Sequence, residues 1–404
     1  MKSLALVVLA AAALRGAEPD ALAIHERIRD RHMPYSTVMD PVFASADSEE
    51  ITGYTRCGDS AIWTGHYLAA ESYRWSVTRS PEAKANIMEA LNGIRKLVDV
   101  TGTDVLARCA VPIDSPWASG IISEESPHGI RIGSVNGQGY YWVGNTSRDQ
   151  YSGVFFGLTV TWNLVDDQLV HDWVSMLATR MLDRLLEDHW LVRMPEGEIT
   201  TSFIGRPDQQ LSLLKLGRRL NPKRFENSYK VLANSAAQTV IIPIFVESRD
   251  PYGSYFKFNL AHINLYNLLT SGDNSWIRRG YVNAFDVVRH ATEDHQNAFF
   301  DMIDTAVNGN NAARDQRVRD NLEAWLQRPS RDFWKDLRPV YPASLDDENR
   351  AWLVIPVVER TPTDFLWQRS PYQLYGGLYG QIESAGIDYI LPYWMARYHH
   401  VVSE

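Results

Sequence analysis

Apolar residues recur at helical spacing in paired segments that are separated by short turns. The first pair covers residues 58–78 and about 80–100, where Ser80 followed by Pro81 is typical of a helix start and Gly102 of a helix end. Four more pairs follow the same pattern. They are predicted at residues 149–165 with 167–189, 207–218 with 222–236, 259–269 with 275–290, and 294–308 with 312–327.

One further helix is predicted at about 388–399, which gives roughly a dozen helices in about six hairpins. The alternation of apolar and polar residues that indicates a half-buried strand is sparse. Residues 129–143, with an Asn-Gly turn at Asn136, predict one short β-hairpin. Residues 240–246 and 352–358 are short apolar runs that fit either strands or buried connections. No linker divides the chain, so we expect a single all-α domain over residues 18–404.

The first residues indicate a signal peptide over residues 1–17. Lys2 precedes an apolar run at residues 4–14, which is too short to span a bilayer and suits the core of such a peptide. Cleavage after Ala17 would place Arg15 three residues before the cut, so the cleavage point stays open. We expect the mature protein to be secreted or periplasmic. It should contain no transmembrane segment, because no later window holds about 18 consecutive apolar residues.

Net charge, cysteine content and missing motifs argue against several classes of binding partner. With 40 Lys+Arg against 49 Asp+Glu, the net charge of −9 has the wrong sign for a nucleic-acid-binding surface. Two cysteines, Cys57 and Cys109, are too few for a disulfide scaffold or a thiolate metal cluster, and they form either one disulfide or two buried thiols. No HExxH motif is present, and Gly153 and Gly157 belong to no phosphate-binding loop, so neither a metal nor a cofactor is expected.

Polar and charged residues cluster near the starts of six predicted helices. Helix capping explains Asp, Asn and Ser at such positions, but it does not require the Trp, Tyr, Arg, Gln and His residues that accompany them. The clusters are Cys57-Gly58-Asp59-Ser60 with Trp63, Arg148-Asp149-Gln150-Tyr151, Gly205-Arg206-Pro207-Asp208-Gln209-Gln210, Asn259-Leu260-Ala261-His262 with Asn264, Glu293-Asp294-His295-Gln296-Asn297, and Gly386-Ile387-Asp388-Tyr389 with Tyr393, Trp394 and Arg397.

The hairpins and these clusters resemble the six-hairpin glycosidase-like superfamily, whose fold is an (α/α)6 toroid. The stretch from Asp364 to Pro371 and the Arg148 cluster are also similar to uncharacterised secreted bacterial proteins. The resemblance implies a toroid of about six helical hairpins, with a central cleft that takes an oligo- or polysaccharide. It favours a glycoside hydrolase that uses two carboxylates as acid and as base or nucleophile.

Asp149 is the first candidate for the ionised carboxylate, because Arg148 and the helix dipole stabilise its charge. Asp388, in a less polar setting, is the better candidate for the proton donor. Further candidates are Asp59, Asp208 and Asp294. The thirteen predicted substrate-binding residues are Trp63, Arg148, Gln150, Tyr151, Arg206, Gln209, Asn259, Asn297, Trp367, Arg369, Tyr393, Trp394 and Arg397.

Two other functions stay open. A polysaccharide lyase would use His262 or His295 to remove a proton next to a uronate carboxylate. A non-catalytic glycan-binding protein would use the same aromatic and amide side chains without chemistry. For an enzyme, we expect Asp59, Asp149, Asp208, His262, His295 and Asp388 to surround one cavity. Lys215, by contrast, is expected on a solvated helix face near Arg218 and Arg219.

Overall fold

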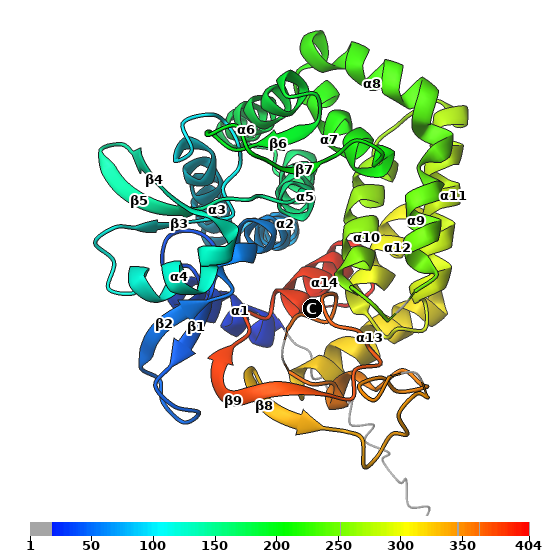
Figure 1. Cartoon of the computed structure of the whole chain (residues 1–404). Coiled ribbons are helices and arrows are strands. Elements are labelled where there is room, and N and C mark those ends of the chain that lie inside the picture. Colours follow the sequence, from blue (N-terminus) through cyan, green and yellow to red (C-terminus); the bar gives the residue numbers. More distant parts are fainter. Residues whose placement is uncertain (1–17, 251, 346, 363, 404) are drawn as a thin grey trace, which may run out of the picture.

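The computed structural model describes residues 18–403 except 251, 346 and 363, and it is mostly helical, as predicted (Figure 1). Helices occupy all the predicted positions. They are α2 (Ser60–Thr78), α3 (Pro81–Asp99), α5 (Arg148–Leu164), α6 (Gln168–Glu187), α7 (Pro207–Leu220), α8 (Pro222–Ala236), α10 (Phe256–Leu269), α11 (Ser275–Thr292), α12 (Ala298–Asn308), α13 (Ala312–Leu326) and α14 (Ile387–Tyr398). The predicted signal peptide lies outside the described residues.

Local capping sets several of these helix starts. Ser80 accepts a hydrogen bond from the Ala83 backbone N–H and is followed by Pro81, as the sequence predicted. The start of α12 was placed at residue 294, but the helix begins at Ala298, because the Asn297 side chain accepts from the backbone N–H groups of Phe299 and Phe300. Three helices were not predicted: α1 (Glu18–Arg27), α4 (Ala118–Glu125) and α9 (Ile241–Ser248).

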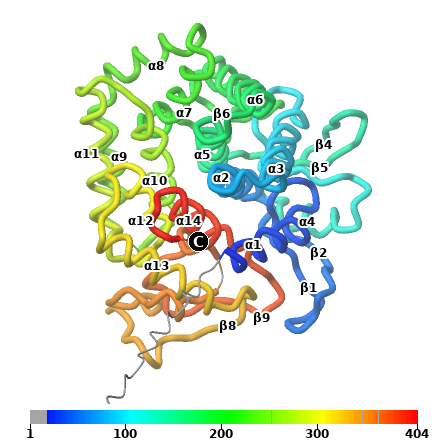
Figure 2. Tube along the Cα trace, turned by 180° about the vertical axis from the view of Figure 1, so that it is seen from behind, coloured from blue at the N-terminus to red at the C-terminus, as the bar shows by residue number. Residues whose placement is uncertain are grey.

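Six helices contact one another in a circuit. Helix α2 packs against α5 and α14, α10 packs against α5, α7 and α12, and α12 packs against α14. Each of these six helices also contacts a helix that is not part of the circuit, namely α3, α6, α8, α11, α13 or α1. Seen from behind, the helices keep this arrangement, and the N-terminal α1 lies beside the C-terminal α14 (Figure 2).

The expectation of an all-α fold with a single β-hairpin is confirmed only in part: the described residues are mostly helical, but they also form three small sheets. The predicted hairpin is confirmed as β4 (Ile130–Val135) and β5 (Gln138–Val143), and β3 (Cys109–Pro112) pairs with β5. A four-stranded sheet has the order β2-β1-β9-β8, and β6 pairs with β7. The bounds are β1 (Asp40–Phe43), β2 (Ile51–Thr55), β6 (Leu191–Arg193), β7 (Ile199–Ser202), β8 (Arg331–Asp336) and β9 (Tyr375–Glu383).

The two ambiguous apolar runs are not strands. Residues 240–246 fall mainly within α9, and residues 352–358 lie in irregular chain that leads into a 3-10 turn at Val357–Glu359. Short apolar runs fit a helix and a strand equally well by periodicity alone, so tertiary packing decides between them.

Helices α2 and α5 touch backbone to backbone through three glycines. A Cβ added to Gly65 would lie 2.1 Å from the Gly153 carbonyl oxygen, and one added to Gly157 would lie 2.3 Å from the Gly65 carbonyl oxygen. A Cβ at Gly153 would lie 2.8 Å from the Ile62 Cα atom. Glycine at these positions therefore allows the two helices to approach more closely than any side chain would permit.

We predict that Gly153→Ala lowers the free energy of unfolding by about 3 kcal/mol, because the added methyl group meets backbone atoms that cannot move aside. Gly120→Ala in α4 is the matched control, since nothing lies within 4 Å of its added Cβ. Urea unfolding of the two variants measures the difference. Equal urea midpoints for the two variants would show that α2 and α5 can move apart without a loss of stability.

Lys215 is buried, which corrects the expectation of a solvated helix face. Its ammonium group donates hydrogen bonds to the Leu268 and Ser271 carbonyl oxygens and to the Asp273 carboxylate. Burial lowers the pKa of Lys215 to about 8, although Asp273 opposes this shift. The lysine therefore joins α7 to the C-terminal end of α10, where a cation is favoured by the helix dipole.

Lys215→Met should reduce the free energy of unfolding by about 3 kcal/mol, because it removes the cation from a buried ion pair and leaves Asp273 with fewer partners. Lys230→Met in α8 removes an exposed partner of Glu226 and should change stability by less than about 0.5 kcal/mol. Thermal and urea unfolding at pH 7 compare the two. Similar decreases in the free energy of unfolding for the two variants would mean that Lys215 does not stabilise the contact between α7 and α10.

One helical stretch within the described residues, Pro222–Ser248, is long and apolar enough to cross a membrane by length and composition alone. In the structure it comprises α8, a 3-10 turn and α9, and α9 exposes Ile242, Phe245 and Val246. The absence of a transmembrane segment in the mature chain stays a prediction.

Candidate functional site

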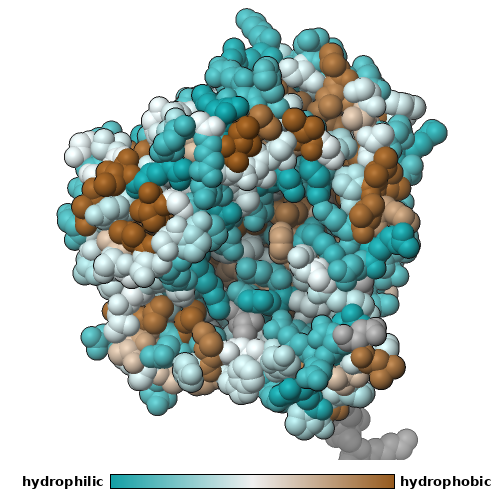
Figure 3. Space-filling model, viewed as in Figure 1, coloured by the Kyte–Doolittle hydropathy of each residue, from teal (hydrophilic) through white to brown (hydrophobic). Residues whose placement is uncertain are grey.

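A cavity of about 320 Å³ opens at the N-terminal end of α2, a volume suited to a small ligand. Its walls come from β1, the turn that leads into α2, the end of α4 and the loop after residue 363. The lining residues are Asp40, Arg56, Gly58, Asp59, Trp63, Arg108, Glu125, His128, Asp364, Phe365, Gln368, Arg369 and Ser384. In the orientation of Figure 1, the centre of this face is recessed and bordered largely by hydrophilic residues (Figure 3).

Asp59 occupies the N-cap position of α2, yet its side chain makes no capping hydrogen bond. Its Oδ1 atom accepts from Gln150 Nε2 at 3.0 Å and lies 3.7 Å from Arg108 Nη1. The side chain remains 35% exposed. Burial of the carboxyl group raises the pKa of Asp59 to about 6, and the nearby Asp149 carboxylate raises it further. Arg108 and Gln150 lower this pKa. Capping therefore does not explain this residue.

Asp149 stands behind Asp59 and does not line the cavity. It accepts hydrogen bonds from Ser147 Oγ and, at 3.1 Å, from the Gln150 backbone N–H. Ser147 Oγ in turn accepts from Arg108 Nη2 at 2.6 Å. The two carboxylates thus share one arginine, directly for Asp59 and through a serine for Asp149, and their charges influence each other.

Asp364 is the second carboxylate of the cavity, and two arginines hold it. Arg56 Nη1 lies 3.3 Å from Asp364 Oδ1 and donates to Asp40 Oδ2 at 3.1 Å, while Arg369 Nε donates to Asp364 Oδ2. The Asp364 side chain is buried. The backbone of Arg56 is left-handed, with φ of 57°, which turns the chain from β2 into α2 and points to a locally demanding conformation.

Glu125 fixes the turn that presents Asp59. Its Oε1 atom accepts from the Gly58 backbone N–H at 2.6 Å, and its Oε2 atom lies 2.7 Å from His128 Nδ1. A Cβ at Gly58 would lie 2.6 Å from Glu125 Oε2, so any larger residue there would displace this carboxylate. The neighbouring Cys57 and Cys109 are free buried thiols, and the contact with Cys109 together with burial raises the pKa of Cys57.

Aromatic side chains close the floor of the cavity. The Trp63 ring meets Phe365 edge-on with centroids 5.0 Å apart, and the fully buried Trp367 stacks on His66 at 5.2 Å. Phe299 of α12 also contacts Trp367, at 4.9 Å. Trp367 was predicted to bind substrate, but the structure places it in the core, whereas Trp63 and Phe365 line the cavity.

Asp388, the predicted proton donor, is fully buried at the start of α14 and does not line the cavity. It accepts from the Leu366 backbone N–H at 2.9 Å and lies 3.7 Å from Arg328 Nη1. Burial raises its pKa, and Arg328 opposes the shift. Asn297 donates to the Leu366 carbonyl oxygen at 3.4 Å. Both side chains therefore hold the loop that carries Asp364 and Trp367.

Three other candidates lie in separate places. Asp208 is buried and paired with Arg206, which also binds Glu247 of α9. His262 donates from Nδ1 to the Phe258 carbonyl oxygen at 2.7 Å and stacks on Phe300 at 4.0 Å. Burial lowers its pKa to about 4, so the ring is neutral. Asp294 is exposed in a turn.

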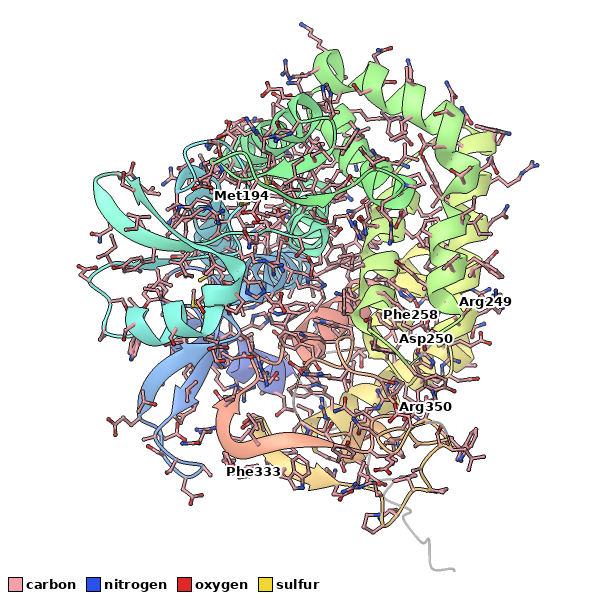
Figure 4. The ribbon with its side chains drawn as sticks, in the orientation of Figure 1. Met194, Arg249, Asp250, Phe258, Phe333 and Arg350 are labelled. Carbon is pink, nitrogen blue, oxygen red and sulfur yellow. The ribbon has the colours of Figure 1, made fainter. Side chains whose placement is uncertain are left out.

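His295 is buried between two tyrosines, 3.0 Å from Tyr255 Oη and 3.4 Å from Tyr372 Oη, and burial lowers its pKa to about 4. Tyr372 in turn contacts Tyr252, and the Arg350 guanidinium lies 3.8 Å from the Tyr252 ring centroid. Asp250, Phe258 and Arg350 are labelled on this side of the molecule, across from α4 (Figure 4).

Most of the remaining predicted binding residues stabilise the helix array. Those that are buried away from the cavity are Gln150, Tyr151, Gln209, Asn259, Tyr393, Trp394 and Arg397. For example, Tyr151 Oη accepts from the Leu106 backbone N–H at 3.1 Å, and Trp394 Nε1 donates to His25 Nε2 at 2.7 Å. Arg148 donates to the Ser202 carbonyl oxygen at 2.8 Å.

The predicted site is therefore brought together only in part. Of the six residues expected to surround one cavity, only Asp59 lines the cavity described above. Two of the predicted substrate-binding residues, Trp63 and Arg369, also line it. Sequence reasoning missed Arg56, Arg108, Glu125, His128 and Asp364. The left-handed Arg56 carries no recognisable motif, and Asp364 is about 300 residues from Asp59 along the chain, so nothing local links them.

No family model matches the chain, and a search of curated proteins finds no match. Among the residues that the structure describes, no group of three or more His, Cys, Asp and Glu side chains is placed to hold a metal ion. The chemistry of this cavity is therefore argued from its own side chains.

Asp59→Asn should raise the melting temperature at pH 7–8. The fold raises the pKa of Asp59 from its ordinary value to about 6, so ionised Asp59 destabilises the folded state above that pH and no longer does so near pH 4. The gain should therefore shrink as the pH falls from 7 to 4. Asp320→Asn, on the exposed surface of α13, serves as the control in the same thermal scans. A lower melting temperature at pH 8 would contradict the electrostatic assignment.

Proposed function

We propose that this chain is an exported carbohydrate-active enzyme that hydrolyses a glycosidic bond, with Asp59 as the proton donor and Asp364 as the base or nucleophile. One observation carries the proposal: a partly exposed carboxyl group with a pKa of about 6 shares a cavity with a second carboxylate that two arginines hold. A glycosidase needs two carboxyl groups in opposite protonation states.

The proposal includes an (α/α)6 toroid of about six helical hairpins, in line with the resemblance to six-hairpin glycosidases. It is supported by the circuit of contacts from α2 through α5, α10, α12 and α14 back to α2, with α7 against α5 and α10. Each helix of this circuit also has an outer partner. In this arrangement the cavity lies at the N-terminal end of an inner helix.

The proposed chemistry assigns one task to each group. Protonated Asp59 donates its proton to the glycosidic oxygen as the bond to the leaving sugar breaks. The Asp364 carboxylate, which Arg56 and Arg369 hold in place, then either activates water or attacks the anomeric carbon. The Trp63 and Phe365 rings offer apolar surface to a pyranose, while Gln368 and Arg369 offer hydrogen-bond donors.

In this proposal Asp149 does not react with substrate, although the sequence had suggested it as the ionised catalytic carboxylate. Because it lies behind Asp59 and makes no part of the cavity wall, its negative charge acts by raising the pKa of Asp59. Arg108, which contacts Asp59 directly, acts in the opposite direction. Burial is the largest cause of the raised pKa of Asp59, and these two charges adjust it in opposite directions.

A lyase is the second candidate, and one observation favours it. His128 is half-buried in the cavity wall with Nδ1 2.7 Å from Glu125 Oε2, and Arg369 lines the same cavity. A histidine that a carboxylate orients can remove a proton, and an arginine can neutralise a uronate carboxylate. The histidines first considered for this role, His262 and His295, are buried elsewhere.

We expect Asp59→Asn to lower turnover by about 10²- to 10⁴-fold while glycan binding persists. The test measures turnover on a panel of neutral and uronate-containing oligosaccharides, with binding in parallel and Asp320→Asn as control. Undiminished turnover would remove Asp59 from the mechanism. Unsaturated products that depend on His128 would favour the lyase, and binding without turnover by the unmodified protein would favour a glycan-binding protein.

The pH profile tests the same assignment independently. As pH rises through about 6, the rate should fall because Asp59 loses the proton that it must donate. Asp149→Asn removes a charge that raises this pKa, so the fall should move to lower pH. Arg108→Gln should move it to higher pH. Shifts in the same direction would contradict the assigned charges.

A further inference from the structure

A second cavity, of about 370 Å³, lies between β2 and α4 at the left of Figure 1. Its lining residues are Val42, Thr52, Gly53, Tyr54, Thr55, Pro116, Trp117, Ser119, Gly120, Glu124 and Ile382. We call it the β2–α4 groove. None of its residues belongs to the six helix-start clusters.

The groove and the Asp59 cavity share a thin wall. Thr55 and Glu124 line the groove, and the residues that follow them in sequence, Arg56 and Glu125, line the Asp59 cavity. Glu124 Oε1 accepts from Thr55 Oγ1 at 2.5 Å and from the Arg56 backbone N–H at 3.1 Å, which ties the two sides of the wall together. The Asp59 cavity and the groove are therefore adjacent, one on each side of this wall.

An aromatic pair with an unused hydroxyl group forms the groove surface. The Tyr54 and Trp117 rings meet edge-on with centroids 5.0 Å apart, and Trp117 remains half-buried. Within the described residues, Tyr54 Oη has no hydrogen-bond partner. Burial raises its pKa to about 12, so it stays a donor at neutral pH. A flat apolar face beside hydroxyl donors and acceptors suits a pyranose ring.

The charges of the groove differ from those of the Asp59 cavity. Among the described residues, those that line the groove include one acidic residue, Glu124, and no arginine, lysine or histidine. The Asp59 cavity contains three arginines. A sugar with a carboxylate would meet repulsion from Glu124 without a compensating cation, so an uncharged sugar fits the groove better.

We infer that the β2–α4 groove binds uncharged sugar units of the same oligosaccharide whose scissile bond occupies the Asp59 cavity. The inference rests on the proposed function. It adds the place where the rest of the oligosaccharide binds and the kind of sugar unit that binds there. One face of a sugar stacks on Trp117, while Tyr54, Ser119 and Glu124 bind its hydroxyl groups. A substrate of several units should therefore be favoured over a disaccharide.

Two groove variants and one control test this inference with neutral oligosaccharides of two to six units. Trp117→Ala removes the stacking surface and should lower the ratio of kcat/KM for the longest to the shortest substrate by about tenfold. Gly120→Tyr fills the groove from a position where nothing lies within 4 Å of the added Cβ, so it should lower the ratio without removing packing. Trp276→Ala, an exposed tryptophan on α11, should leave the ratio unchanged.

The outcomes separate this inference from the proposed function. If Asp59→Asn abolishes turnover but both groove variants keep the unmodified ratio, the groove is not a subsite and the hydrolase assignment stands. If Asp59→Asn turns over normally, calorimetric binding decides: equal affinity of the unmodified protein and Trp117→Ala for the six-unit oligosaccharide overturns the groove inference. Failure to bind any glycan overturns both proposals, and preference for acidic units at this end overturns the choice of an uncharged sugar.

Discussion

The contact between α2 and α5 is the constraint on which the candidate site depends. Three glycines let the two backbones touch, so the first turns of both helices lie side by side. Gln150 of α5 can then reach both Asp59 Oδ1 and, through its Oε1 atom at 3.0 Å, the Ile62 backbone N–H of α2. Wider packing would separate Asp59 from Asp149 and admit water, which would reduce both the burial and the charge repulsion that raise the pKa of Asp59.

Most carboxylates around this contact are neutralised by built-in partners. Arg206 binds Asp208, Arg56 binds Asp40, and Asp388 accepts a backbone N–H and lies 3.7 Å from Arg328. Asp59 differs because its side chain is 35% exposed to solvent, although Arg108 lies 3.7 Å away. A carboxyl group that is held but not neutralised is a feature of acid–base sites, since structural ion pairs fix the charge instead.

The helices were predictable because their signals are local. Pro81, Pro207 and Pro222 mark helix starts within one residue, and the Asn136 turn fixes its hairpin. The four-stranded sheet was not predictable in the same way, since β1 pairs with β9 through Val42 and Ile382, more than 300 residues apart. Lys215 looked solvated because its partner Asp273 lies on another hairpin. The site shows the same division: Asp59 and Trp63 come from a local cluster, whereas Asp364 and Arg108 join them only through the tertiary fold.

The loop that carries Asp364, Phe365 and Trp367 belongs to both the hydrophobic core and the cavity. Trp367 is enclosed by aromatic side chains of α2 and α12, and Leu366 is held on both sides of its peptide group. Substitutions in this loop therefore disturb folding together with ligand contacts. The β2–α4 groove on the other side of Glu124 and Glu125 is built on a smaller apolar cluster of its own. Substitutions in this groove, whether they arise by natural drift or by engineering, can therefore change ligand specificity while the packing of the helices stays intact.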